Sequence, residues 1–110
     1  MIIDKNENTV IITQEKLGLI DFVKRIESSY DTFKNNNIIV NINTLKQADV
    51  ASIVEFLQLS NNHRGANHSF VVVSDSADLD KMPDEIIVVP TVKEAYDVIE
   101  MEDMERDLGF

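Results

Sequence analysis

The sequence predicts an α/β domain with a largely parallel sheet of about five strands, helices packed on it and an N-terminal β-hairpin. Short β-branched runs at residues 38–42, 70–73 and 86–89 are typical of strands buried on both faces. Stretches with apolar residues three and four apart separate these runs, as amphipathic helices require. Strands that alternate with helices favour parallel pairing through right-handed crossovers.

The first third of the chain supplies the hairpin and a helix. Apolar patches flank residues 6–8, where Asn tolerates left-handed turn geometry, so we expect a hairpin over residues 1–14. Residues 17–35 carry an apolar helical face. Three consecutive Asn at 35–37 end that helix, because short polar side chains compete with helical hydrogen bonds.

The middle of the chain predicts strand, helix and strand. A buried strand at residues 38–42 precedes a loop, and Asp49 is placed to cap a helix over residues 50–61. Gly65 is the expected C-terminal cap of that helix, because glycine accepts left-handed geometry. A second buried strand follows at residues 69–74.

The last third predicts a strand and a final helix. Residues 77–81 allow only a short helix, since Pro83 interrupts it. Residues 85–89 form the third buried strand. Thr91 and Glu94 have the spacing of a capping box, which marks the start of the final helix. No linker or repeat divides the chain, so we expect one domain over residues 1–110.

Composition narrows the function classes. The chain has no Cys, which excludes disulfides and thiolate sites. Its net charge of −10 argues against nucleic acids and membranes as partners, because phosphate groups attract Lys and Arg clusters. Residues 1–5 lack a signal-peptide pattern, and no apolar run approaches the roughly 20 residues of a membrane span. We expect a soluble cytoplasmic protein.

The C-terminal segment is strongly acidic. Residues 94–110 hold seven acidic residues and one basic residue, and we expect an acidic helix or tail over residues 100–110. Apolar side chains interleave with the acids at Met101, Met104 and Leu108 and at the C-terminal Phe110. Two interpretations remain open: a docking helix for a basic partner, or a terminal helix whose apolar residues pack back onto the domain.

Metal binding and catalysis are not expected. His63 and His68 are the only histidines, and we expect both in a solvated loop between a helix and a strand. The alternative is a metal site to which Asp75, Asp78 and Asp80 add oxygen ligands. Residues 75–80 lack the Gly and Glu of a calcium loop, so we expect Asp75 or Ser76 to cap a helix or form a turn. The chain has only three Gly and no phosphate-binding or nucleophile motif. We predict no catalytic residue, no metal and no cofactor.

Polar residues near the end of the first buried strand also have two readings. Asn41 and Asn43 are interpreted as turn-forming residues. The alternative is that they line a ligand-binding edge of the sheet.

Three features resemble the STAS domain of anti-sigma factor antagonists over about residues 3–100. They are the hairpin before a long helix, the strand, loop and helix start at residues 37–52, and the final strand and helix start at residues 88–95. The family carries an Asp-Ser-Ser-Gly motif where this chain has Asp49, Val50, Ala51 and Ser52. Ala51 falls on the family's phosphoryl acceptor, and a register slip of one residue makes Ser52 the candidate phosphorylation site.

The chain is also similar to short bacterial STAS-like proteins that sometimes carry the name ribonuclease Z, through its ending at residues 100–110. That name would imply a zinc-dependent nuclease, but the enzyme's His-x-His-x-Asp-His cluster is absent. The missing cluster argues against a nuclease. The alternatives to the main prediction are a metal-dependent hydrolase and a structural homodimer.

The main prediction is a non-catalytic, regulatory protein-binding module. Its contact residues are Asp49, Val50, Ala51 and Ser52. The resemblance implies an anti-sigma factor or a related kinase-like regulator as the partner. The module itself is expected to be a monomer or a weak homodimer.

Overall fold

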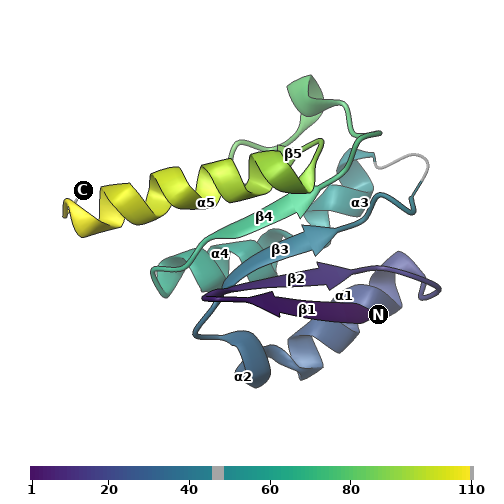
Figure 1. Ribbon diagram of the computed structural model, residues 1–110. Helices are drawn as coiled ribbons and strands as arrows, with labels where there is room; N and C mark the ends of the chain where they lie inside the picture. The colour runs from purple at the N-terminus through teal and green to yellow at the C-terminus, as the bar shows by residue number, and fades with distance from the viewer. Residues whose placement is uncertain (46–48, 110) are drawn as a thin grey trace.

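A computed structural model describes residues 1–45 and 49–109 and confirms the predicted α/β class (Figure 1). The elements are β1 Ile2–Asn6, β2 Thr9–Thr13, α1 Leu19–Ser28, α2 Tyr30–Phe33, β3 Asn37–Asn41, α3 Val50–Val54, α4 Leu57–Gly65, β4 Phe70–Val73, the 3-10 helix η1 Leu79–Lys81, β5 Ile87–Val89 and α5 Val92–Asp107. The five strands form one sheet in the order β1-β2-β3-β4-β5. β1 pairs antiparallel with β2, and the other pairs are parallel, which is consistent with a STAS-like topology.

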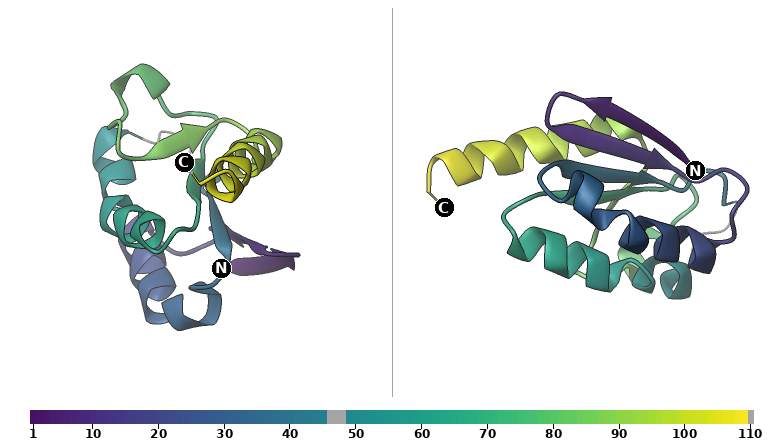
Figure 2. Two further views of the ribbon diagram at one scale, coloured as in Figure 1. Left: turned by 90° about the vertical axis from the view of Figure 1, so that its left-hand side faces the viewer. Right: turned by 90° about the horizontal axis from the view of Figure 1, so that it is seen from below.

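The sheet lies between two unequal helical layers. Figure 2 shows α1 to α4 on one face and α5 alone on the other. Neighbouring residues of β3 enter opposite cores: Ile38 and Val40 face the larger layer, whereas Ile39 packs with Ala95 and Ile99 of α5. Side chains alternate between the faces of a strand, so a strand covered on both sides must be apolar throughout.

The N-terminal hairpin confirms the predicted turn, with one change of residue. Asn6 pairs with Thr9, so Glu7 and Asn8 form the turn. Glu7, rather than an Asn, takes the left-handed conformation, with φ 54°. Every residue of β1 is exposed, because this edge strand contributes no residue to either hydrophobic core.

Both predicted long helices are divided. The helix expected over residues 17–35 ends at Ser28, and α2 follows as a separate turn that buries Phe33. The helix expected over residues 50–61 divides into α3 and α4, where Glu55 and Phe56 make tighter i→i+3 backbone bonds. This 3-10-like tightening leaves both Ile53 and Phe56 fully buried.

Two further expectations need correction. Gly65 is the last residue of α4, and the left-handed residue after the helix is Asn67, with φ 67°. Asn accepts this geometry because its short polar side chain can hydrogen-bond locally. β5 is half-buried instead of fully buried, since it lies at the sheet edge opposite β1.

The final helix begins where the capping box predicts. The Thr91 hydroxyl accepts a hydrogen bond from the Glu94 amide at 3.1 Å, and α5 then continues for 16 residues. A helix of that length spans about 24 Å, and its C-terminal half projects beyond the sheet (Figures 1 and 2).

Candidate functional site

The predicted contact residues lie at the start of α3, past the carboxyl end of β3. Asp49 is the N-cap: its carboxylate accepts the Ser52 amide at 2.9 Å. The backbone and side-chain hydrogen bonds from Ser52 hold the pKa of the Asp49 carboxyl below its ordinary value. The predicted cap is therefore confirmed, and the backbone amide of Ser52 is bound by the N-cap residue.

A shallow surface groove brings this helix start beside the first turn of α1. Its lining residues are Gly18, Leu19, Ile20, Asp21, Asp49, Ala51, Ser52 and Glu55. The Ile20 side chain is 57% exposed and gives this groove an apolar wall. Of the four predicted contact residues, Val50 is half-buried and is not part of this lining.

The sequence does not predict that the first turn of α1 lines the same groove as the start of α3. The starts of α1 and α3 are about thirty positions apart, and neither carries a motif that refers to the other. Only the order of the strands indicates that the two helix starts are neighbours. Both helices leave the carboxyl ends of the adjacent parallel strands β2 and β3, so their first turns must lie at the same edge of the sheet.

The Gln14 side chain links the two segments that lead into the groove. This side chain is only 3% exposed. Its amide nitrogen donates to the Leu17 carbonyl at 2.8 Å, and its amide oxygen accepts from the Thr44 hydroxyl at 3.2 Å. One buried amide therefore ties the connection before α1 to the loop before α3.

The two asparagines of the same loop make one local and one long-range hydrogen bond. The Asn41 side-chain oxygen accepts the Asn43 amide at 3.0 Å, and the Asn43 oxygen accepts the Asp75 amide at 2.9 Å. The first bond agrees with the turn interpretation of Asn41, whereas Asn43 joins the loop after β3 to the residues after β4. Residues 46–48, which belong to the segment that carries the family resemblance, lie outside the described residues.

His63 corrects the expectation that both histidines lie in a solvated loop. Because α4 continues to Gly65, His63 occupies its buried face and is fully enclosed. Nε2 donates to the Asn36 carbonyl at 2.6 Å, and Nδ1 accepts the Tyr30 hydroxyl at 2.6 Å. Burial lowers the pKa of the His63 imidazole, and the nearby His68 and Arg64 act in the same direction.

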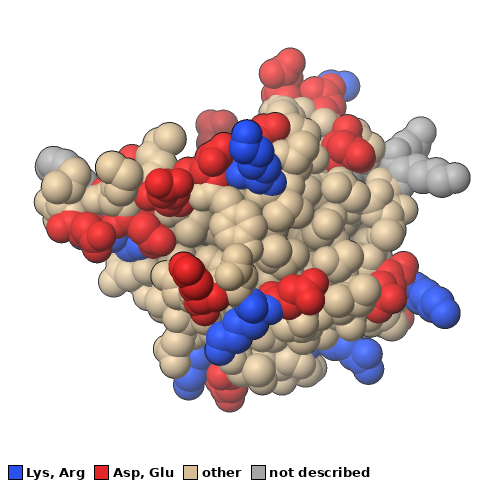
Figure 3. Space-filling view, viewed as in Figure 1, with Lys and Arg blue, Asp and Glu red and all other residues tan. Residues whose placement is uncertain are grey.

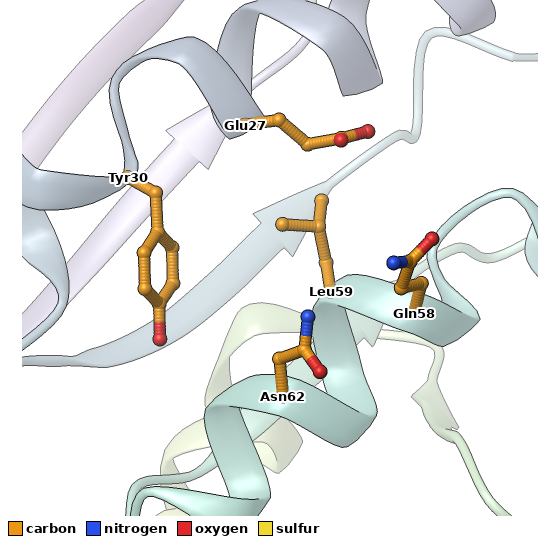
Figure 4. A pocket seen from close by; sticks show the side chains of 5 residues that line it. All are labelled: Glu27, Tyr30, Gln58, Leu59 and Asn62. Carbon is orange, nitrogen blue, oxygen red and sulfur yellow. The ribbon is translucent and has the colours of Figure 1, made fainter.

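A small cavity adjoins this histidine through Tyr30. Glu27 and Tyr30 face three residues of α4 across it (Figure 4). Its volume of about 190 Å³ is below the range of about 300–1,000 Å³ that is usual for small-molecule sites. This pocket is therefore small for a ligand site, and it shares no lining residue with the groove at α1 and α3.

The acidic side chains near η1 have structural roles. Asp78 caps η1 by accepting the Asp80 amide at 3.2 Å and lies 3.7 Å from the Lys81 ammonium. Within the described ranges, no group of three or more His, Cys, Asp or Glu side chains is placed to hold a metal ion. The cap of η1 is therefore Asp78 and not Asp75 or Ser76, because the helix begins only at Leu79.

The acidic helix α5 exposes its apolar stripe. Met101, Met104 and Leu108 are 61%, 60% and 68% exposed, so the alternative in which they pack back onto the domain is wrong for these three. Phe110 lies outside the described residues. The opposite face of α5 is anchored: the Glu102 carboxylate binds the Arg64 guanidinium at 2.9 Å and the Ser69 hydroxyl at 2.6 Å.

The groove at α1 and α3 thus joins an exposed aliphatic side chain to a carboxylate rim. Among the described parts of the chain, no helix is both long enough and apolar enough to cross a membrane. Comparisons with protein-family models and with curated proteins find no match to the chain.

Proposed function

We propose that the chain is a non-catalytic, cytoplasmic protein-binding module of STAS-like type that acts in regulation. The groove formed by the starts of α1 and α3 is its contact surface. The observation that carries the proposal is the position of Ile20, an exposed aliphatic residue that lines the same groove as Asp49, Ala51 and Ser52. Exposed apolar side chains within a polar rim are typical of protein interfaces.

The charges of the groove specify the chemistry of the partner. Asp21, Asp49 and Glu55 line it, and no Lys or Arg is among the described residues of the lining. We therefore propose a partner surface with an apolar protrusion surrounded by Lys or Arg, such as a basic face of an anti-sigma factor or kinase-like regulator. The net charge of −10 would also accelerate encounter with such a surface.

The polar contacts support a binding role over a catalytic one. Hydrolysis by a nucleophile needs a base that is oriented toward it and accessible to substrate. Both ring nitrogens of His63 are occupied inside the fold, by Tyr30 and the Asn36 carbonyl. Asp49 is engaged by Ser52 as a helix cap. These residues are used for structure, and their positions favour a binding module over the hydrolase alternative.

We expect Ala51→Arg to reduce partner binding at least tenfold, because the long side chain fills the groove that the partner must enter. The tagged chain is used to capture its partner from source-cell extract, and affinity is then measured calorimetrically with both purified proteins. Ala66→Arg is the matched control, since Ala66 is also exposed but lies at the end of α4. Equal affinities for the two variants would remove the groove as the contact surface.

The phosphorylation hypothesis gives a separate expectation at Ser52. A phosphoserine adds roughly −1.5 to −2 charges, here beside Asp49 and within a groove that already has a carboxylate rim. We expect Ser52→Asp to strengthen binding of a basic partner about two- to fivefold, the range of an exposed ion pair. Ser52→Ala should leave affinity unchanged. Identical partner affinity for wild type and both variants would eliminate the switch.

A further inference from the structure

A second groove lies at the other end of the sheet, between α5 and the β1–β2 turn. The turn lies beside the part of α5 that begins to project from the sheet (Figures 1 and 2). The lining residues are Asn6, Glu7, Asn8, Thr9, Tyr96, Ile99, Glu100, Asp103, Met104 and Asp107. None of these residues lines the groove at α1 and α3.

This groove has an apolar floor. Ile99 is buried at its base, Tyr96 is half-buried, and Met104 is 60% exposed at its rim. The Asn6 amide nitrogen lies 3.4 Å from the Tyr96 hydroxyl and so links the aromatic residue to the hairpin. An aromatic ring and a flexible thioether offer a surface to which an alkyl chain or a cation can adapt.

The rim of the groove is acidic and incompletely neutralised. Four of its lining residues are carboxylates. Asp103 is bound by Arg106, but Glu7, Glu100 and Asp107 have no ion pair among residues 1–45 and 49–109. No Lys or Arg lines the groove within the described chain. Figure 3 shows acidic side chains gathered over the projecting end of α5, with little positive charge among them.

We propose that this groove binds a lysine- or arginine-bearing segment of a second partner protein. The alkyl stem of such a side chain would lie over Tyr96 and Met104, and its charged head would reach Glu100 and Asp107. Lys and Arg combine these two properties, since their stems bury against apolar surface while their heads stay near solvent and carboxylates. The aromatic ring adds cation–π attraction.

The proposal is independent of the contact surface at α3. The two grooves use different residues and lie at opposite ends of the parallel strands. One partner can therefore occupy the α3 groove while another holds α5. A small domain with two such surfaces would act as an adaptor between two proteins.

The test uses a labelled peptide of alternating Lys and Leu, with spermidine and a Glu-for-Lys peptide as comparison probes. Binding to the full chain is followed by fluorescence anisotropy at low salt and located by amide chemical shifts. We expect the Lys-Leu peptide to bind and to shift the amides of residues 6–9 and 96–107. We expect Glu100→Lys and Asp107→Lys each to weaken it about tenfold, since each replaces an attractive carboxylate by a repelling charge.

Asp97→Lys is the matched control. It makes the same charge change on an exposed position of α5 but outside the groove, and we expect less than a twofold effect. Equal weakening by Asp97→Lys, shifts spread evenly over all acidic surfaces, or no binding of the Lys-Leu peptide would each overturn the proposal. If spermidine bound as tightly as the peptide, the groove would be a site for small cations, and the proposal of a protein segment would be wrong. Shifts confined to residues 18–21 and 49–55 would also overturn it, while leaving the α3 groove supported.

Discussion

Replacing His63 by leucine is expected to lower the free energy of unfolding by about 2–4 kcal/mol. The imidazole is fully buried and hydrogen-bonded at both nitrogens. Leucine leaves the Asn36 carbonyl without its donor and removes the acceptor of the Tyr30 hydroxyl. Urea denaturation near pH 7.5 measures the loss.

His68→Leu is the matched control for this change. His68 stacks on His63 with ring centroids 5.3 Å apart, but it is only half-buried. We expect it to cost less than about 1 kcal/mol. A loss as large as that of His63→Leu would show that ring stacking, and not the two hydrogen bonds, stabilises this region.

The same residue predicts a pH dependence. The pKa of His63 in the folded chain lies below its ordinary value of 6.5, so the unfolded chain binds more protons as the pH falls through that range. The contribution of neutral His63 is therefore complete above about pH 6.5 and is lost as the pH falls below it. Protonation would also place a second charge beside Arg64 and His68 and remove the acceptor for Tyr30. We expect the stability difference between wild type and His63→Leu to shrink from pH 7.5 to pH 5.

Replacing Glu102 by alanine is expected to cost about 2–3 kcal/mol. Glu102 and Arg64 form a mostly buried pair, with side chains 19% and 25% exposed. The change leaves the Arg64 guanidinium without its counter-charge. The buried Nε of Arg64 already lacks a hydrogen-bond partner among the described residues, so the guanidinium would become still less satisfied. It also removes the acceptor for the Ser69 hydroxyl. Denaturant unfolding measures the effect.

Two further variants test whether the pair is responsible. Glu105→Ala removes a carboxylate from an exposed position of the same helix and should change stability by less than about 0.5 kcal/mol. The double variant Arg64→Ala, Glu102→Ala should be no less stable than Glu102→Ala alone, because no unpaired cation remains. Additive losses in the double variant would contradict the coupling.

The local features of the sequence predict the fold well. The β-branched runs become β3, β4 and β5 because their apolar side chains enter the cores on both sides of the sheet, those of β5 only in part. Asp49 and Thr91 are found as caps because each bonds an amide three residues away. Such signals are complete within a few residues of sequence.

The features that depend on tertiary placement are not found this way. The sequence predicts that the second helix ends near residue 61, which places His63 in a loop. In the structure α4 continues to Gly65, so His63 lies on the helix and points into the core. The groove at α3 needs the first turn of α1, and only the pairing of β2 with β3 brings the two together. Helix length and strand order, not residue type, decide both outcomes.

The open side of β1 has a consequence for self-association. An outermost strand offers unpaired backbone donors and acceptors, and here Ile2 and Ile3 are also 44% and 45% exposed. Asp4 and Lys5 occupy the centre of this strand. Charged side chains on an edge strand disfavour its pairing with the edge of a second copy, so we expect Asp4 and Lys5 to work against growth into extended β-ribbons.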